Sequence, residues 1–354
     1  MEPGRVNPHI ASIAVATPPF VLDQARSLEH LLRHYGDKLK PRSVSLMRKI
    51  FANPGIKKRY FAIDDVDAFL SEDPDGRIAR FSRWSVNLSE KAVLEALSDA
   101  GLTINSISGL VVNTCTGYIC PGISTYLIEK LGLRRDIKVY DLVGSGCGGA
   151  VPNLEVARSL MTNASEDVIV SVSVEICSAT FQMGDDLSLL ISNALFGDGA
   201  AAAVLRGRPG GLELIESSSC YVPEDRDAIR YVHKNGHLHN QLSTNLDELV
   251  RKAVSQVTAK LLGPRSLRVE DIKHWALHTG GEKIINSIRD EIGLSETQLR
   301  ATRKVLSGYG NMSSPTVWFV LKEILKEGMK EGDWCIMAAF GAGLSAHAFL
   351  LRKT

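Results

Sequence analysis

Several features that would assign a chain to a specialised class are missing from these 354 residues. No apolar run reaches the roughly 18–20 residues that a membrane-spanning helix needs, so we expect no membrane span. No basic stretch followed by an apolar one stands near the N-terminus, so secretion is not expected either. The net charge of +1 gives no support for a nucleic-acid partner.

Cysteine is also scarce. The six cysteines lie far apart and form no CxxC pair, which excludes a small disulfide scaffold and favours reduced thiols in a cytoplasmic protein. His233, His237 and His239 are close in sequence, but their spacing lacks a nearby carboxylate or thiolate companion, so no metal site is predicted. The apolar fraction of 44% is ordinary, and this length can bury the core of one large or two fused domains.

The same landmarks occur twice along the chain in the same order, which indicates an internal duplication. The pairs are GSGC (144–147) with GYGN (308–311), CTG (115–117) with HTG (278–280), and FGDG (196–199) with FGAG (340–343). We therefore expect two halves, residues 1–207 and 208–354, that face each other across a pseudo-twofold axis. Cys147, His278 and Asn311 are the reactive residues at their junction.

Strands alternate with helices in both halves, which predicts a layered α/β fold with helices against the sheet. The expected strands are residues 9–17, 108–113, 137–142, 167–174, 198–205, 211–217, 273–277, 334–339 and 345–351. The expected helices are residues 23–49, 86–101, 122–131, 147–162, 244–262, 281–292 and 311–326. Residues 64–75 are expected to form an exposed excursion, and Asn235-Gly236 predicts a hairpin.

Cys147 lies on a turn that suits a nucleophile. Its neighbouring glycines let the backbone turn sharply and approach a ligand. The first N–H groups of the following helix favour a thiolate and an oxyanion beside it. A single buried cysteine is more often a small core residue, but this Gly-rich turn favours the nucleophile.

His278 and Asn311 occupy the corresponding landmarks of the second half. His278 ends an apolar strand beside flexible glycines and can present its ring to a cleft; the structural alternative is a histidine bonded at a strand edge. Asn311 stands where the first half has its cysteine. Its amide cannot attack, but it can donate to a developing negative oxygen, and it can also cap the helix.

These motifs, GSGCGG, HTGG and GYGNMSS, resemble the Cys-His-Asn triad of the thiolase fold and, more narrowly, the chalcone synthase family of type III polyketide synthases. Further similar segments are CTGYICPG (115–122), VEICSATF (174–181), NALFGDGAAA (193–202), LSGYGNMSS (306–314) and AFGAGL (339–344). The resemblance implies a thiolase-like αβαβα layered fold built from two duplicated halves, and a homodimer. HTGG differs from the histidine followed by Gln-Ala-Asn of the related type III β-ketoacyl synthases.

The resemblance also implies the reaction. A starter acyl group moves from coenzyme A to Cys147, and malonyl-CoA is decarboxylated to an enolate that attacks the thioester. The cycle repeats, and the chain is cyclised to a resorcinol, phloroglucinol or pyrone. His278 helps to hold Cys147 as a thiolate and, with Asn311, donates to the malonyl thioester carbonyl. Coenzyme A thioesters are substrates, and no cofactor or metal is implied.

Several residues fall on family positions around the acyl cavity. They are Phe196 as an aromatic gate, with Cys115, Thr116, Cys177, Ala179, Thr180, Gly236, Ser313, Gly341 and Gly343. Cys115 in its Cys-Thr-Gly context resembles bacterial members that use malonyl units as primer. Cys120 falls where the family sends a side chain into the partner subunit's cavity. For these cysteines, core filling is an equally good interpretation.

Coenzyme A carries phosphates, so we expect basic residues at the entrance to the site. The expected contacts are Lys49, Arg48, Lys57, Gly280 and Gly281. Leu46 and Asn53 stand at two entrance positions that are basic in the family. Solvated charge on a helix face is the alternative for Arg48 and Lys57.

Two other functions remain open from the sequence. A single-round β-ketoacyl synthase would use an acyl carrier protein and stop after one condensation. A non-catalytic thiolase-fold subunit would carry a damaged triad, and the intact Cys147, His278 and Asn311 argue against it. The starter, the number of extensions and the mode of cyclisation are not predicted, because pockets select such features by small volume differences.

Overall fold

The computed structural model describes residues 8–162, 166–234 and 236–354. Its strands are β1 (His9–Ala16), β2 (Phe20–Asp23), β3 (Lys58–Phe61), β4 (Gly109–Asn113), β5 (Lys138–Leu142), β6 (Val168–Glu175), β7 (Gly199–Arg206), β8 (Leu212–Tyr221), β9 (Ile229–Lys234), β10 (His237–Leu242), β11 (His274–Leu277), β12 (Trp334–Gly341) and β13 (Ser345–Lys353). Its helices are α1 (Gln24–Tyr35), α2 (Pro41–Phe51), α3 (Val66–Leu70), α4 (Pro74–Asp99), α5 (Ile123–Leu131), α6 (Ala150–Ser159), α7 (Leu187–Leu195), α8 (Leu246–Leu262), α9 (Glu282–Ile292), α10 (Glu296–Tyr309) and α11 (Thr316–Lys326).

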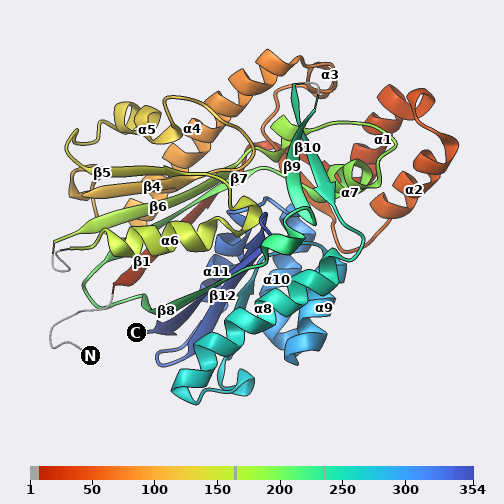
Figure 1. Cartoon of the computed structure of the whole chain (residues 1–354). Coiled ribbons are helices and arrows are strands. Elements are labelled where there is room, and N and C mark those ends of the chain that lie inside the picture. The colour runs from red at the N-terminus through yellow and green to blue at the C-terminus, as the bar shows by residue number, and fades with distance from the viewer. Residues whose placement is uncertain (1–7, 163–165, 235) are drawn as a thin grey trace.

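The central sheet repeats one topology twice. Its strand order is β11-β12-β13-β8-β1-β7-β6-β4-β5. Figure 1 shows β5, β4 and β6 on one side of α6, and β8 and β12 on the other. In one part β4 and β6 are parallel, and β7 runs antiparallel to β6 and β1. In the other part β11 and β12 are parallel, and β13 runs antiparallel to β12 and β8. The parts meet where β1 pairs with β8 at His9↔Glu213 and Ile10↔Leu212. This repetition confirms the duplicated fold that the sequence predicts.

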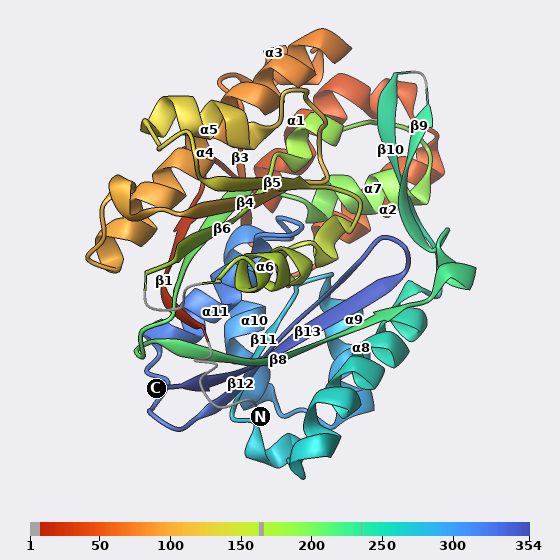
Figure 2. The same ribbon diagram turned by 60° about the vertical axis from the view of Figure 1, so that its left-hand side comes forward.

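Helices and sheet parts alternate as layers, which Figure 2 shows from the side. Buried side chains of α6 and α11 pack between the two parts of the sheet in one apolar cluster. Helices α4 and α5 cover the outer face of the first part, and α8 and α9 cover that of the second. Both central helices begin near the middle of the molecule. The turns that precede them are therefore brought together.

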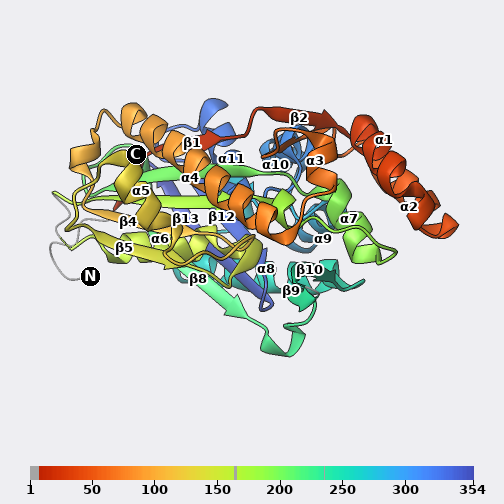
Figure 3. The ribbon, with the colours of Figure 1, turned by 90° about the horizontal axis from the view of Figure 1, so that it is seen from above.

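A smaller apolar cluster lies outside these layers, where α1, α2, α3 and α7 pack on one another. Figure 3 shows α1 and α2 at one end of the molecule. The expected single helix over 23–49 is wrong, because Pro41 starts a second helix after the extended Lys40. The expected excursion over 64–75 contains α3, and α4 begins at Pro74 behind the capping residue Asp73, well before position 86.

Other differences concern the starts of helices. The helix expected from 147 begins at Ala150, after a 3₁₀ turn over Gly146–Gly148. The helix expected from 311 begins at Thr316, because Ser313 has a positive φ of 58°. Helices α7 and α10 were not expected, although Ser295 and Gln298 form a capping box at the start of α10.

The expected hairpin is formed by β9 and β10, which pair antiparallel from Lys234↔His237. Gly236 has a φ of 76°, as such a tight turn requires, and Asn235 lies outside the described residues. Within the described ranges, no helix combines the length and apolar character needed to cross a membrane.

Candidate active site

Cys147 lies in the middle of the 3₁₀ turn between β5 and α6, and the residue is 8% exposed. Gly144 and Gly146 have φ values of 96° and 54°, which side chains with a Cβ rarely adopt. The two glycines therefore allow the sharp turn at Cys147 that the sequence predicts.

The corresponding loop of the second half packs against this turn. A Cβ added to Gly341 would lie 2.2 Å from the carbonyl oxygen of Ser145 and 3.0 Å from the backbone nitrogen of Cys147. Gly341 thus supports the cysteine turn by its lack of a side chain. Gly343, with a φ of 121°, lies in the turn that leads into β13.

His278 follows β11 and is fully buried. Its backbone N–H donates to the carbonyl of Ala338, and its ring packs edge-on against Phe340 with centroids 5.0 Å apart. Within the described ranges, neither ring nitrogen has a hydrogen-bond partner. A buried polar atom without a partner typically lowers the free energy of unfolding by about 1–3 kcal/mol. A ligand that forms hydrogen bonds with these two nitrogens would recover that cost, so both nitrogens are available for binding.

Asn311 is fixed by contacts with the first half of the chain. Its backbone N–H donates to the carbonyl of Leu195, its carbonyl accepts from the N–H of Gly197, and it forms an isolated β-bridge with Phe196. The side-chain Oδ1 accepts from the N–H of Ser313 at 2.7 Å. Because the oxygen is used in this way, the amide NH₂ is the donor left for substrate.

One cavity of about 390 Å³ brings these residues together. Cys147, His278, Asn311 and Phe196 all line it, although they come from four separate segments of the chain. We define it as the catalytic cavity. The sequence predicts this meeting. Phe196 lies in the wall of the cavity, and its role as a gate stays a prediction.

The catalytic cavity favours a neutral thiol and a neutral imidazole. Burial raises the pKa of Cys147 to about 12, against a smaller opposite effect of the Ser313 hydroxyl. Burial likewise lowers the pKa of His278 to about 3. Burial therefore works against the thiolate expected at Cys147, because the desolvation of the charge outweighs the N–H groups of the turn.

Ser313 lies between two sulfur atoms. Its hydroxyl donates to the Sγ of Cys147 at 3.2 Å and lies 3.3 Å from the Sγ of Cys115. Burial and the neighbouring Glu175 raise the pKa of Cys115. The Ser313 hydroxyl therefore links the sulfur of the catalytic cavity to that of Cys115.

A second, larger cavity of about 770 Å³ contains most of the other expected substrate contacts. Cys115, Thr116, Ala179, Thr180 and Gly236 line it, together with His233 and His237. Tyr231 also lines this cavity and was missed by the sequence reasoning. Its hydroxyl lies 3.5 Å from that of Thr180, and burial raises its pKa. Of the three neighbouring histidines, His239 instead lies near Asp186.

Cys177 faces a third pocket, which also includes Phe196 and Thr180 and is lined mainly by apolar side chains. The expected cavity residues are thus distributed over three adjoining spaces, except Ser313, Gly341 and Gly343, which are not among the residues that line them. Sequence spacing does not distinguish these spaces, because Cys177 and Ala179 stand two positions apart and line different ones.

The expected coenzyme A contacts are only partly brought together. Gly280 and Gly281 line the catalytic cavity, whereas Arg48, Lys49 and Lys57 are exposed beside its lining residues Ile50, Asn53 and Ile56. Lys283 lines the cavity directly, and its ammonium group bonds to Asp247 at 2.8 Å. It was missed because a lysine at the start of a helix has no distinctive pattern.

Glu175 is a further residue that the sequence reasoning missed. This buried carboxylate accepts from the hydroxyls of Thr114, Thr116 and Ser314 and from the backbone N–H groups of Cys115 and Thr116. A single acid at the end of the buried strand β6 was the available signal. Glu175 holds the loop with Cys115 against the turn that contains Ser313.

Cys120 is exposed on the segment before α5. Tyr118, Tyr140 and Val143 are exposed in the same region and along the edge strand β5. This surface is the candidate contact with a partner subunit.

Comparisons with known proteins indicate the family of this chain. Residues 213–354 match the family described as chalcone and stilbene synthases, C-terminal domain, and residues 22–213 match FAE1/type III polyketide synthase-like proteins. A 3,5-dihydroxyphenylacetyl-CoA synthase of Streptomyces toyocaensis is 29% identical over 320 residues, covering 86% of this chain and 82% of that protein. A 1,3,6,8-tetrahydroxynaphthalene synthase of Streptomyces peucetius subsp. caesius is 28% identical over 316 residues, covering 87% and 84%.

Solved structures share the whole architecture. PKS-I from the brown alga Ectocarpus siliculosus superposes with a TM-score of 0.90 at 27% identity and covers 100% of both chains. The 1,3,6,8-tetrahydroxynaphthalene synthase of Streptomyces coelicolor A3(2), a bacterial type III polyketide synthase, gives 0.90 at 26% identity, covering 98% of this chain and 99% of that one. The chain therefore belongs to the FAE1/type III polyketide synthase-like family and is a type III polyketide synthase, an acyltransferase with the thiolase fold.

Proposed function

We propose that this enzyme extends a Cys147-bound acyl starter with malonyl-CoA, with Cys147, His278 and Asn311 in distinct roles. The observation that carries this assignment is the pair of unpartnered ring nitrogens of buried His278, in the cavity that also contains Cys147 and Asn311. One nitrogen can accept the thiol proton and the other can donate to a substrate oxygen. A neutral imidazole has these two capacities at once.

The loading step is an acyl transfer. The Cys147 sulfur bonds to the carbonyl carbon of the acyl-CoA, the carbon–sulfur bond to coenzyme A breaks, and His278 carries the thiol proton to the departing thiolate. Because both groups are neutral beforehand, proton transfer accompanies the attack.

The extension step begins with loss of CO₂ from malonyl-CoA. The electrons of the broken carbon–carbon bond form an enolate, whose oxygen receives hydrogen bonds from the Asn311 amide and the His278 N–H. Each well-placed donor of this type contributes about 2.7–4 kcal/mol to the transition state. The enolate carbon then attacks the Cys147 thioester and releases the sulfur, which is reprotonated. No cofactor takes part in these steps.

The product class follows from the relatives and from the large second cavity. The relatives named above are a dihydroxyphenylacetyl-CoA synthase and a tetrahydroxynaphthalene synthase, both named for aromatic products. A cavity of about 770 Å³ beside Cys115 offers space for a chain that has been extended several times. We therefore favour iterated extension and cyclisation over a single round on an acyl carrier protein.

We also propose a homodimer that works in the cytoplasm. Tyr118, Tyr140 and Val143 are exposed apolar residues on the edge strand β5 and on the segments after β4 and β5, and exposed apolar surface favours a protein contact. Light scattering should give twice the mass of one chain, and Tyr140→Arg should lower it towards one chain. A monomeric wild type would refute the dimer.

The reaction is tested by mass spectrometry of the protein with malonyl-CoA, with and without acyl-CoA starters. Wild type should release cyclised products of several extensions, and Cys147→Ala should release none. Acylation of Cys147 without a product beyond one condensation would favour the single-round enzyme, and an unacylated Cys147 would refute both.

Asn311→Asp separates the two steps. It replaces the donor with a carboxylate, so release of CO₂ from malonyl-CoA should fall about 100- to 1,000-fold, while loading of Cys147 remains within a few fold. Equal losses in loading and decarboxylation would contradict the role of Asn311 at the enolate.

A further inference from the structure

One arginine in the wall of the second cavity carries a charge that the proposed reaction does not use. Arg77 lies in the first turn of α4, is half-buried and lines this cavity. Its Nη1 donates to the backbone carbonyl of Phe181. Its Nε is buried and has no hydrogen-bond partner in the described part of the chain. The guanidinium is therefore held by a neutral group and keeps a donor for a ligand.

The acid that acts on Arg77 is already engaged elsewhere. The charge of Glu72 raises the pKa of Arg77, but the two oxygens of Glu72 accept from Nε and Nη2 of Arg80 at 2.8–3.1 Å. Burial has the larger effect and lowers the pKa of Arg77. A guanidinium loses hydration when it is buried, so an anion that binds beside it restores part of the lost stabilisation.

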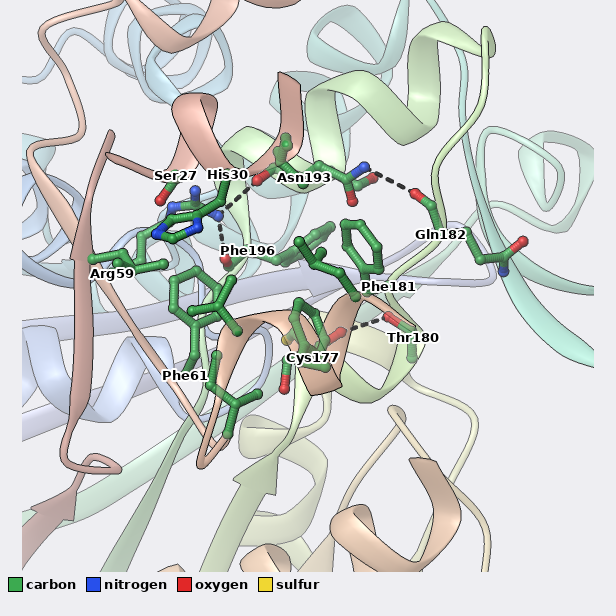
Figure 4. A pocket seen from close by; sticks show the side chains of 18 of the residues that line it. Ser27, His30, Arg59, Phe61, Cys177, Thr180, Phe181, Gln182, Asn193 and Phe196 are labelled. Atoms are coloured by element: carbon green, nitrogen blue, oxygen red, sulfur yellow. Dashed lines mark hydrogen bonds between the residues drawn. The ribbon is translucent and has the colours of Figure 1, made fainter. Parts of the chain in front are cut away.

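The segment after β6 fixes the position of this guanidinium. Thr180 lines the second cavity, and its hydroxyl donates to the carbonyl of Cys177 at 2.8 Å (Figure 4). The next residue is Phe181, whose ring packs at 5.0 Å between centroids against that of Phe69. The carbonyl that accepts from Arg77 thus belongs to an anchored residue. Binding an anion at Arg77 therefore requires little further ordering of its long side chain.

The rest of the lining also favours an anion over a cation. Arg230 of β9 lines the cavity and is paired with Asp227, and His237 of β10 lies close enough for the charge of Arg77, after burial, to lower its pKa. Among the described residues that line the cavity, Asp75 is the single carboxylate, and it is exposed. Arg77 is therefore the cation of this lining that an anionic ligand would pair with.

The second cavity reaches the reactive sulfur. Gly146 and Cys115 line it, whereas Cys147 lines the catalytic cavity. The Ser313 hydroxyl lies 3.2 Å from the Sγ of Cys147 and 3.3 Å from that of Cys115. One hydroxyl group therefore separates the sulfur that carries the starter from a sulfur in the wall of the second cavity. The volume of about 770 Å³ leaves space for extension units beside a starter that enters it.

We propose that Arg77 binds the free carboxylate of a dicarboxylic starter whose other carboxyl carbon is bonded to Cys147. This inference rests on the proposed function, because it names the starter of that same reaction. The starter would be a coenzyme A monothioester of a dicarboxylic acid with four carbons or more. A malonyl group is too short for this contact, because its single methylene keeps the carboxylate beside the reacting carbonyl. A guanidinium can give a carboxylate two parallel hydrogen bonds, which a neutral donor does not match.

The test compares starters that differ only in the terminal group, with malonyl-CoA as extender. Succinyl-, glutaryl- and adipyl-CoA are set against butyryl-, valeryl- and hexanoyl-CoA, which have the same numbers of carbons and no carboxylate. The wild-type ratio of kcat/KM, acid to neutral, should be at least about tenfold at the best length. Arg77→Gln should lower this ratio about 10- to 100-fold, and Arg77→Lys should restore part of it. Loss of folded protein cancels in the ratio.

Arg83→Gln is the matched control. Arg83 lies on the same helix, is exposed, bonds to Asp64 and is not among the residues that line the second cavity, so the ratio should stay as in wild type. A wild-type ratio near one at every length, or the same ratio in wild type and Arg77→Gln, would overturn the role of Arg77 and leave the polyketide reaction intact.

A binding experiment decides the case in which no starter is extended. Cys147→Ala protein is titrated by calorimetry with the dicarboxylic and the neutral thioester of each length. Tighter binding of a dicarboxylic thioester that disappears on adding Arg77→Gln supports the carboxylate site even if the proposed condensation fails. Equal affinities within every pair would overturn it.

Discussion

The state of the Cys147 thiol is set by burial more than by its place at a Gly-rich turn. The raised pKa of Cys147 and the lowered pKa of His278 mean that a thiolate forms only when the proton moves to the ring. The equilibrium within the pair does not depend on pH as long as both groups start neutral.

We therefore expect alkylation of Cys147 by iodoacetamide to be nearly independent of pH between about 5 and 9 in wild type, a range inside the pKa values of about 3 and 12. In His278→Ala the rate should be lower and rise about tenfold per pH unit, since only hydroxide then creates the thiolate. Mass spectrometry of the Cys147 peptide measures both. A wild-type rate that titrates near neutral pH would contradict the neutral pair.

Glu175 is the residue whose loss should most affect the second cavity. Glu175→Ala removes the acceptor for buried groups of Cys115, Thr116 and Ser314 and should lower the free energy of unfolding by about 3–5 kcal/mol. Glu175→Gln keeps one carbonyl oxygen and should cost less than half of that. Urea denaturation measures both, and equal losses would show that the charge alone matters.

At the scale of elements, the sequence predicts the order of strands and helices in the layers but not the helical cluster around α1, α2, α3 and α7. The central elements carry clear landmarks, because their ends form the site. In and beside the cluster, Pro41 and Pro74 are the first residues of helices α2 and α4. A prediction from apolar periodicity alone joins α2 to α1 and starts α4 too late. The three cavity residues from distant segments could be predicted from the duplication. The partition of Cys115 and Cys177 into separate pockets depends on packing between elements, which spacing does not encode.

Alanine substitutions at two glycines of the second half, Gly341 and Gly308, test how closely the elements pack at the site. Gly341→Ala would place a Cβ against the turn of Cys147, and should lower both activity and the free energy of unfolding, the latter by about 1–3 kcal/mol. Gly308→Ala, inside α10 with open space around the new Cβ, should raise the free energy of unfolding by about 0.5–1 kcal/mol. Calorimetry and an activity assay on both variants measure the contrast; a harmless Gly341→Ala would contradict the packing.

For the whole molecule, buried histidines should limit stability in acid. Burial lowers the pKa of His278 to about 3 and that of His347 to about 4, whereas an unfolded histidine titrates near 6.5. Below pH 6.5 the unfolded chain therefore binds more protons than the folded chain. The free energy of unfolding falls as the pH is lowered, until the pKa values of the folded state are reached. Each histidine should remove about 2 kcal/mol at pH 5.

Urea denaturation at pH 7.5 and pH 5.0 measures this loss. In His278→Gln the difference between the two pH values should shrink by about 2 kcal/mol relative to wild type. His233→Gln, at an exposed position on β9, should leave the difference unchanged. The same difference in wild type and His278→Gln would mean that His278 is not neutral in the folded protein. The domain boundary at 207/208 stays a prediction, since the continuous sheet joins both halves.

The bridge between Phe196 and Asn311, and the contact of Gly341 with Ser145, join the halves beside Cys147 and Asn311, which differ although they stand at corresponding places. A newly duplicated ancestor would have carried the same residue at positions 147 and 311, and with it either two sulfurs or two amides. The division of labour between a cysteine and an asparagine is therefore younger than the gene duplication. Because the two halves pack against each other, later substitutions in one half were constrained by the residues of the other. Substitutions at the contact between the halves are therefore expected to have arisen in compensating pairs.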